Sequence, residues 1–285
     1  MRAIKKVIKF VLRKLRRRSS NNLLWTGKEL DCPNFGDFIG PYLFRKITGR
    51  EPKRSMPSNF SLTTTFLAVG SIISWAREDS IIWGSGIVNR GQAFPKPFSV
   101  CAVRGPITRQ RFLEQGYSCP SIFGDPGLLL PCFYQPKKKD KRYKIGFIPH
   151  YVDKKRCAQL VKQNKDILHI DVFKDIECVV DDISLCDWVV SSSLHGLIVA
   201  HAYGKKAVWV KFSDELWGDD TKFFDYYGSL GVSSDVSPIW ISRPLSEVSE
   251  VEELLEARKF VPAKRIVQDL QKGLLNSCPF PSREC

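Results

Sequence analysis

Short apolar runs recur along the chain, and most of them end in a glycine beside a serine, an arginine or an aspartate. Bounded apolar runs of this length are typical of buried strands, and the longer segments between them show helical spacing. The predicted strands are 23–26, 66–69, 81–83, 99–103, 144–149, 168–172, 189–190 and 207–211. The predicted helices are 38–48, 108–115, 154–164, 181–186, 197–204, 251–256 and 263–275. This alternation predicts an α/β protein whose site lies at the carboxyl ends of the strands.

A polar stretch at 135–143 divides this pattern into two series of similar build. A chain of 285 residues with 43% apolar content is long enough for two domains, each with its own core. We therefore predict an N-terminal domain over 21–136 and a C-terminal domain over 143–285, preceded by a separate helix over 1–20. The cleft between two such halves is the expected ligand site.

The first eighteen residues differ from the rest of the chain in charge. The net charge is +14, and residues 1–18 hold nine Lys or Arg and no acid, which leaves +5 for the other 267 residues. The apolar positions of this segment fall on one side of a helix: Ile4, Ile8, Val11, Leu12 and Leu15. We predict a basic amphipathic helix that binds an anionic membrane surface, with the protein in the cytoplasm on the inner face of the cell membrane.

Other interpretations of the basic segment stay open. A nucleic-acid arm, an organelle transit peptide and a solvated tail would all tolerate this composition. Charges interrupt every apolar run of the segment, so it is neither a signal peptide nor a membrane span.

Nine cysteines are scattered along the chain, and none of them forms a CxxC pair. An odd number without regular spacing indicates reduced thiols of a cytosolic protein rather than a disulfide framework. The spacing also lacks the ligand pattern of a zinc site, so we expect no metal.

The stretch from 189 to 210 combines a strand, a polar elbow and a helix. Three serines and His195 follow the apolar pair Val189 and Val190, and Gly196 comes next. The elbow and the helix offer unpaired backbone N–H groups and the positive end of a helix dipole, which suit an anion. An imidazole at this place can transfer a proton beside the anion. The alternative is a histidine that caps an ordinary helix.

Two charged residues stand at the ends of other predicted strands. Arg104 precedes Gly105 and a helix start, a place suited to binding a carboxylate or a phosphate. Asp125 lies between a glycine and a proline, where it can bind a hydroxyl or act as a base. Both residues also have ordinary alternatives, namely a surface arginine on a loop and an aspartate that shapes a turn before proline.

Further segments carry polar or aromatic side chains that can contact a ligand. One loop leads into a helix, which Asp37 can cap while Asn34 contacts a polar ligand. Ser85 and Gly86 belong to a glycine-rich elbow that lets a ligand approach the backbone. The segment 222–227 mixes aromatics with a charged pair, as sugar platforms and amphipathic helices both do. The sequence has no GxGxxG, P-loop or GxSxG motif, so dinucleotide, nucleotide-triphosphate and serine-hydrolase functions lack support.

Taken together, these segments resemble the polysaccharide pyruvyltransferase family over residues 23–230. The motifs that carry the resemblance are Asn34-Phe35-Gly36-Asp37, the elbows at Gly70 and Trp83–Gly86, Arg104-Gly105-Pro106 with Thr108, Gly124–Gly127, and Ser191–Gly196 with its small-residue helix. The resemblance implies two Rossmann-like halves that face a cleft, similar to the GT-B glycosyltransferases. It also implies transfer of pyruvate from phosphoenolpyruvate onto a sugar of an exopolysaccharide, capsule or cell-wall polymer precursor, as a ketal, with release of phosphate.

The resemblance assigns roles to the matching residues. Arg104 would hold the anionic donor, and the donor pocket would be lined by the elbow residues Ser193, Leu194, His195 and Gly196. Many members of the family carry arginine where this chain has Ser193, so another cation must meet the charge of the donor. Lys222 is the first candidate for that cation, ahead of Lys205 and Lys206.

The residue types suit this chemistry. Phosphoenolpyruvate carries a carboxylate and a phosphate on a small frame, and it needs cations and helix N-termini. We predict that His195 acts as the acid and Asp125 as the weaker candidate base, and that the acceptor contacts Asn34, Asp37, Ser85 and Gly86. No step demands a metal or a cofactor. The expected partners are phosphoenolpyruvate, a saccharide acceptor that can be lipid-linked, and the anionic membrane surface through residues 1–18, with no nucleic acid.

Two other functions stay open at the level of sequence. A GT-B-like glycosyltransferase would use the histidine elbow to hold the diphosphate of a nucleotide sugar. A non-catalytic scaffold of a polymer-assembly complex would bind the membrane without transferring a proton. Incorporation of label from phosphoenolpyruvate separates the first of these from a pyruvyltransferase.

Overall fold

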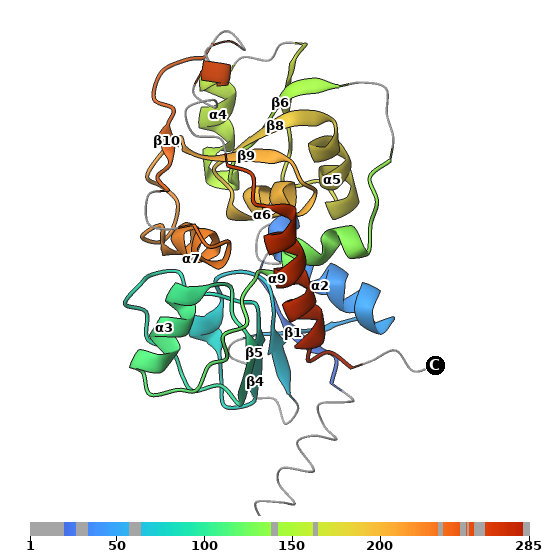
Figure 1. The fold of residues 1–285 in the computed structure, drawn as a ribbon, viewed down its shortest axis with the longest axis vertical. Helices are drawn as coiled ribbons and strands as arrows, with labels where there is room; N and C mark the ends of the chain where they lie inside the picture. The colour runs from blue at the N-terminus through green and yellow to red at the C-terminus, as the bar shows by residue number, and fades with distance from the viewer. Residues whose placement is uncertain are drawn as a thin grey trace, which may run out of the picture.

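The computed structural model describes residues 20–26, 34–56, 64–137, 142–161, 165–232, 236–245, 249, 251–253 and 260–281. The predicted basic helix lies outside these residues except for its last position, and so does the end of the predicted helix at 251–256. The described part of the chain forms two parallel five-stranded sheets joined by helices (Figure 1). The predicted α/β class is therefore confirmed. None of the helices described is long and apolar enough to cross a membrane.

The first sheet is built from β1 (Asn22–Leu24), β2 (Lys53–Ser55), β3 (Thr65–Leu67), β4 (Ser80–Trp83) and β5 (Ser99–Ala102). Its spatial order is β2-β1-β3-β4-β5, and every pairing is parallel. All residues of β3 and β4 are buried, as expected for parallel strands that are covered on both faces. The connecting elements are α2 (Phe35–Thr48), η1 (Ile73–Trp75), α3 (Pro106–Glu114) and η2 (Pro126–Cys132).

The second sheet is built from β6 (Tyr143–Ile148), β7 (Ile167–His169), β8 (Cys186–Ser191), β9 (Lys206–Lys211) and β10 (Ile239–Trp240). Its order is β10-β9-β8-β6-β7, and again every pairing is parallel. The accompanying elements are η3 (Tyr151–Asp153), α4 (Lys154–Leu160), α5 (Ile176–Ser184), α6 (Leu194–Ala202), α7 (Thr221–Ser229) and α9 (Lys264–Asn276).

The two sheets repeat one topology. Numbered within its own half, each has the strand order 2-1-3-4-5, the order of a doubly wound α/β sheet. In that order the chain turns from one side of the sheet to the other between its first and third strands, which are β1 and β3 in one half and β6 and β8 in the other. Ligands of such sheets bind outside the carboxyl ends of the strands at this switch point.

Three local differences from the sequence prediction affect the site. The helix α2 begins at Phe35, three residues earlier than predicted, because Asn34 Oδ1 caps it by accepting from Gly36 N at 3.1 Å. The prediction that Asp37 caps this helix is therefore wrong. The helix α6 begins at Leu194, so His195 lies in its first turn rather than in a loop before it. The short strand β2 lies in a polar stretch where no strand was predicted.

The end of the chain returns to the first half. In Figure 1, α9 runs past the junction of the two halves toward the first sheet. Trp83 Nε1, on β4, donates to Leu274 O at 3.0 Å. The ring of Phe280 lies edge-on to Phe44, Phe66 and Trp83, with centroids 4.9 to 5.3 Å apart. The C-terminal segment of the predicted second domain thus completes the core beside the first sheet.

Candidate active site

A cavity of about 270 Å³ lies between the two halves. From the first half it is lined by Thr26, Asn34, Asp37, Gly70, Ser71, Ile72, Trp75 and Val88. From the second half it is lined by His150, Tyr151, Val152, Ser193, Leu194, His195, Glu215, Trp217 and Lys222. Several of these residues lie two or three positions after the ends of β1, β3, β6 and β8, so the switch points of both sheets open into the same space.

The predicted acid and base form a pair at the wall of this cavity, where His195 is part of the lining and the buried Asp125 lies behind it. His195 Nε2 lies 3.8 Å from Asp125 Oδ2. Both atoms are buried and have no hydrogen-bond partner among the residues described. The other oxygen of Asp125 accepts from Gly127 N at 2.8 Å, which fixes the carboxylate at the start of η2. The structure therefore brings together two residues that are 70 positions apart in the sequence.

Burial shifts both pKa values of the pair toward the uncharged forms. Loss of water raises the pKa of Asp125 to about 6, against smaller opposing effects of the Gly127 hydrogen bond and the Arg104 charge. Loss of water also lowers the pKa of His195 to about 3, helped by the positive charges of Arg104 and Lys222. Near neutral pH the imidazole is thus neutral and faces a carboxylate.

Two glycines hold His195 in place. A Cβ atom on Gly36 would lie 2.3 Å from Nδ1 of the histidine ring, so only glycine fits on this face of α2. A Cβ atom on Gly196 would lie 2.4 Å from Ser191 Oγ, which requires glycine where α6 packs on the end of β8. In this arrangement Nε2 faces Asp125 and Nδ1 lies beside Gly36. Gly196 therefore positions the pocket without lining it.

The first turn of α6 opens into the cavity. Ser193 is the N-cap residue of this helix, and its side chain makes no capping hydrogen bond. Ser193 and Leu194 both line the cavity, as predicted for the donor pocket. Because the first N–H groups of a helix lack partners within the helix, this end of α6 suits an anion.

Lys222 is the cation that the structure places in the cavity. It belongs to the first turn of α7, and its Nζ donates to Trp217 O at 3.5 Å. Burial, and next the charge of Arg104, lower its pKa to about 8. The other two candidate lysines lie elsewhere: Lys205 donates to backbone oxygens at the end of α5, and Lys206 stands over the ring of Trp188.

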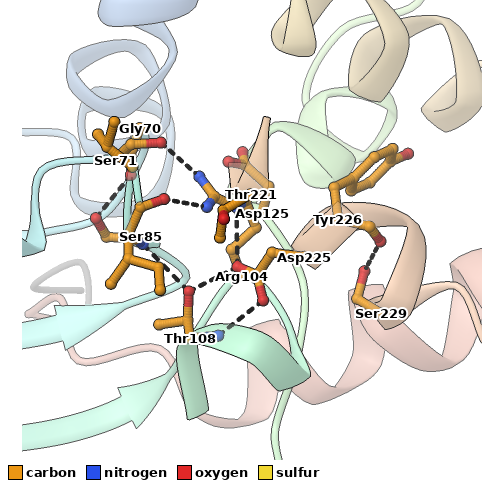
Figure 2. A network of polar contacts seen from close by, with 12 residues as sticks. Gly70, Ser71, Ser85, Arg104, Thr108, Asp125, Thr221, Asp225, Tyr226 and Ser229 are labelled. Atoms are coloured by element: carbon orange, nitrogen blue, oxygen red, sulfur yellow. Dashed lines mark hydrogen bonds and ion pairs between the residues drawn. The ribbon is translucent and has the colours of Figure 1, made fainter. Parts of the chain in front are cut away.

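Arg104 occupies a different place from the one predicted by resemblance. Its side chain is fully buried and forms an ion pair with Asp225 of α7, Nε to Oδ2, at 3.1 Å. Its other nitrogens donate to Ser71 Oγ at 2.7 Å and to Ile87 O at 2.6 Å, and Figure 2 shows Arg104 between Ser71 and Asp225. Arg104 is not among the described residues that line the cavity. It reaches the cavity through Ser71, whose hydroxyl it holds.

The four predicted acceptor residues fall into two pairs. Asn34 and Asp37 line the cavity, and Thr26 Oγ1 donates to Asp37 Oδ1 at 2.6 Å. Ser85 and Gly86 lie behind the wall, where Ser85 Oγ donates to Gly70 O at 2.7 Å. A Cβ on Gly86 would lie 2.3 Å from the Arg104 guanidinium. The second pair thus supports the cavity wall at Gly70 and Arg104.

Sequence reasoning missed several residues of this cavity. His150 and Tyr151 lie two and three residues after β6, the first strand of the second half, and a signal was present because that place is a switch point. Trp75 ends the short helix η1 and Trp217 lies in a loop, and nothing in their sequence neighbourhood marks them as cavity residues. Trp217 is 66% exposed although it lines the cavity, so its indole ring is available to a ligand.

No group of three or more His, Cys, Asp or Glu side chains in the described part of the chain is arranged to hold a metal ion. The expectation that the reaction uses neither metal nor cofactor remains a prediction. The seven cysteines described as free thiols lie apart from the cavity.

The fold and this cavity define an α/β protein with a carboxyl–imidazole pair and a lysine where the switch points of two parallel sheets meet. The family profile described as "Polysaccharide pyruvyl transferase" matches residues 76–214. An uncharacterized protein of Acanthamoeba polyphaga mimivirus is 33% identical over 211 residues, which cover 71% of this chain and 72% of that protein. No solved structure matches the chain. The chain belongs to the polysaccharide pyruvyl transferase family, whose description names transfer of a pyruvyl group onto polysaccharide.

Proposed function

We propose that the protein transfers pyruvate from phosphoenolpyruvate onto a sugar of an exopolysaccharide, capsule or cell-wall polymer precursor, as a ketal, and releases phosphate. The observation that supports this most is the buried pair of Asp125 and His195 beside Lys222 and the open end of α6. Proton transfer and anion binding, the two tasks that the reaction requires, are thereby combined in one cavity.

The reaction divides into steps that these groups can serve. His195, once protonated, gives a proton to the methylene carbon of the donor, which makes the central carbon electrophilic. A sugar hydroxyl attacks that carbon, and its proton passes to the pair of His195 and Asp125. Phosphate leaves with the electrons of its C–O bond, and a second hydroxyl closes the ketal and gives up its proton. The two hydroxyl protons balance the one used on the methylene carbon and the one taken up by phosphate.

The neutral state of His195 agrees with its role as an acid, because the donor changes its surroundings. A donor with a carboxylate and a phosphate brings negative charge beside the ring, which favours imidazolium. Asp125 then receives a hydrogen bond from Nε2–H, and Nδ1 is left as the nitrogen that serves the substrate. Hydrogen bonds of catalytic groups are often long before the substrate binds, which agrees with the separation of 3.8 Å between Nε2 and Oδ2.

The two sides of the cavity suit different substrates. Lys222 and the α6 end would hold the donor, and Arg104 would support that site by its charge and through Ser71. Asn34, Asp37 and the ring of Trp75 would hold a sugar, because amide and carboxylate oxygens accept from hydroxyls. Two sheets whose carboxyl ends face one space also support the proposed GT-B-like arrangement.

We further propose that residues 1–18 bind an anionic membrane surface, which would bring the enzyme to a lipid-linked acceptor on the cytoplasmic side. These residues lie outside the described part of the chain, so the proposal rests on their charge and apolar spacing. The test compares the full chain with a chain that lacks residues 1–18 in co-sedimentation with anionic vesicles. Salt at about 0.5 M should release the full chain, because it screens the attraction between the basic residues and the lipid headgroups. Equal sedimentation of both chains would contradict it.

The main test is phosphate release from phosphoenolpyruvate in the presence of a panel of galactosides, mannosides and lipid-linked oligosaccharides. Wild type should release phosphate only with an acceptor, and His195→Ala should lose about 10²–10⁴-fold of the rate because its proton transfer is gone. The control is His169→Ala, whose ring lies at the end of β7 in a separate cavity. Phosphate release by His195→Ala near the wild-type rate would contradict the assignment, and label transfer from a nucleotide sugar instead would favour a glycosyltransferase.

The role of Lys222 is tested by charge exchange. Lys222→Ala should raise the Michaelis constant for phosphoenolpyruvate, and adding Ser193→Arg should restore part of the affinity, because the family places arginine at that position. An unchanged Michaelis constant in Lys222→Ala would remove this lysine from the donor site.

A further inference from the structure

A second histidine lines the cavity on the side of the second half. His150 lies two residues after the end of β6, and its backbone N–H donates to Ser192 Oγ at 2.9 Å. Ser192 Oγ in turn donates to Asp153 Oδ2 at 2.6 Å, and Ser213 Oγ donates to the other carboxylate oxygen at 2.6 Å. The buried Asp153 carboxylate thus ties together the loops that follow β6, β8 and β9. His150 is held on a rigid frame at the switch point of its sheet.

The imidazole of His150 is arranged to donate one hydrogen bond. Its Nδ1 accepts from Val152 N at 3.5 Å, so the neutral ring carries its proton on Nε2. Burial, and next the charge of Lys222, lower the pKa of His150 to about 3. A neutral ring can lie near Lys222 without mutual repulsion and still offer an N–H group to an anion.

The lysine, the two imidazoles and the open helix end of the cavity all lie on one side. Lys222, His150, His195 and the end of α6 all belong to the second half, whereas the lining residues described from the first half include no cation. The family arginine is absent at Ser193, and the buried Arg104 is already bonded to Asp225, Ser71 and Ile87. Among the lining residues described, an anionic donor therefore finds its cationic contact in the second half.

We propose that His150 Nε2–H and Lys222 Nζ together bind the phosphate group of the donor, in place of the arginine that the family has at the position of Ser193. This inference rests on the proposed function and names a donor-binding residue for it. The ammonium group supplies charge without direction, and the imidazole N–H supplies direction without charge. The two groups together reproduce what one guanidinium provides at a phosphate.

The test measures binding without turnover. Inorganic phosphate is titrated by calorimetry into wild type, His150→Leu and His150→Gln, with no acceptor present. His150→Leu should bind phosphate about tenfold to 100-fold more weakly, the range for one hydrogen bond to a charged group. His150→Gln should stay within about threefold of wild type, since its amide offers an N–H group near the position of Nε2. The control is His169→Leu, which removes a histidine from a separate cavity and should bind as wild type does.

A second measurement uses the wild-type chain, so its result does not depend on whether the variants fold. In protein labelled with ¹⁵N-histidine, addition of phosphate should shift the Nε2–H resonance of His150 and leave that of His169 unchanged. The inference is overturned if His150→Leu binds phosphate like wild type, if both His150 variants lose binding equally, or if the Nε2–H resonance does not move. Intact phosphate binding without pyruvyl transfer would instead count against the proposed function and leave this inference standing.

Discussion

Asp125 shows how burial prepares a carboxylate for proton transfer at the expense of stability. Its Oδ2 is buried without a hydrogen-bond partner among the residues described, and the side chain that faces it at 3.8 Å is the neutral imidazole of His195. A carboxylate in such surroundings ionises reluctantly, which explains a pKa of about 6. The proton of the pair is therefore easily moved in the pH range where enzymes work.

The first prediction concerns the stability of Asp125→Asn. The pKa of Asp125 is raised from 3.8 to about 6 on folding, so its ionised form destabilises the fold above pH 6, and this effect fades as the pH falls from 6 toward 4. Two pKa units correspond to about 3 kcal/mol, and an amide with imperfect partners should recover about 1–2 kcal/mol of it. Urea unfolding should show Asp125→Asn more stable than wild type at pH 8, with little difference at pH 4.5, while activity is lost.

The matched control for this prediction is Asp225→Asn. Asp225 is equally buried but is paired with Arg104, so its neutralisation should destabilise the protein instead. If Asp125→Asn proves less stable than wild type at pH 8, the carboxylate is better solvated than the structure indicates.

The second prediction is that donor binding takes up a proton. Burial lowers the pKa of His195 to about 3, and the negative charges of phosphoenolpyruvate should raise it. At pH 6.5, where Lys222 is already protonated because its pKa is about 8, calorimetry in two buffers of different ionisation enthalpy should show uptake of up to about one proton. His195→Gln should abolish this uptake. Equal binding enthalpies in both buffers for wild type would contradict protonation of His195 by the donor.

At the level of elements, the pair of Arg104 and Asp225 joins β5 of one half to α7 of the other. Asp225 also accepts from Thr108 N at 2.9 Å and from Thr108 Oγ1 at 2.6 Å (Figure 2). A Cβ atom on Gly105 would lie 1.8 Å from Asp225 O, so α7 touches the backbone of the first half directly. The position of Lys222, one turn earlier on α7, is therefore set by residues of the other half.

The third prediction follows from this contact. Arg104→Ala should lower the free energy of unfolding by about 3–5 kcal/mol, because it leaves the carboxylate of Asp225 buried without its charge partner. The control is Arg45→Ala, which removes an exposed ion pair with Glu51 and should change stability by about 1 kcal/mol or less. Comparable losses in the two variants, measured by urea unfolding, would show that the buried pair does not hold the halves together.

The sequence predicted most strands and the residues that end them, because a buried parallel strand is recorded in a local run of apolar residues. It also assigned His195, Asp125 and Lys222 to one site, and the structure places His195 and Lys222 in the cavity lining with Asp125 beside His195. It could not predict that Arg104 is turned away from the cavity, because the partner that holds it is 121 positions distant. It predicted the start of α6 three residues too late. The three serines before the helix suit a loop and a helix cap equally well, so their local sequence does not fix the boundary.

At the level of the whole molecule, buried histidines govern the response to acid. Burial lowers the pKa of His150, His195 and His201, to about 3, 3 and 4. Below pH 6.5 the unfolded chain therefore binds more protons than the folded one. Because proton binding then favours the unfolded chain, the free energy of unfolding falls as the pH falls below 6.5. His201 lies in the second half beside Tyr226, so the effect is not confined to the cavity.

The fourth prediction is a steep loss of stability in mild acid. Each of the three histidines lowers the free energy of unfolding by up to about 1.4 kcal/mol for each pH unit of acidification. Asp125 cancels the effect of about one histidine between pH 4 and 6, because in that range the folded chain binds a proton there that the unfolded chain does not. Urea unfolding between pH 7 and 4.5 should therefore show a fall of roughly 2–3 kcal/mol per unit below pH 6. His201→Gln should flatten that slope by about one histidine. A stability that stays level down to pH 5 would contradict the burial of these rings.

The return of the C-terminal segment to the first half has a consequence for synthesis of the protein. Phe280 and Leu274 fill the core beside β4, yet the ribosome makes them some 190 residues after Trp83. Throughout translation of the second half, the nascent first sheet must expose the apolar surface that Phe280 will cover. We expect a ribosome-bound chain that has not yet reached residue 264 to be held in a chaperone-dependent state, and its release to coincide with emergence of the final helix.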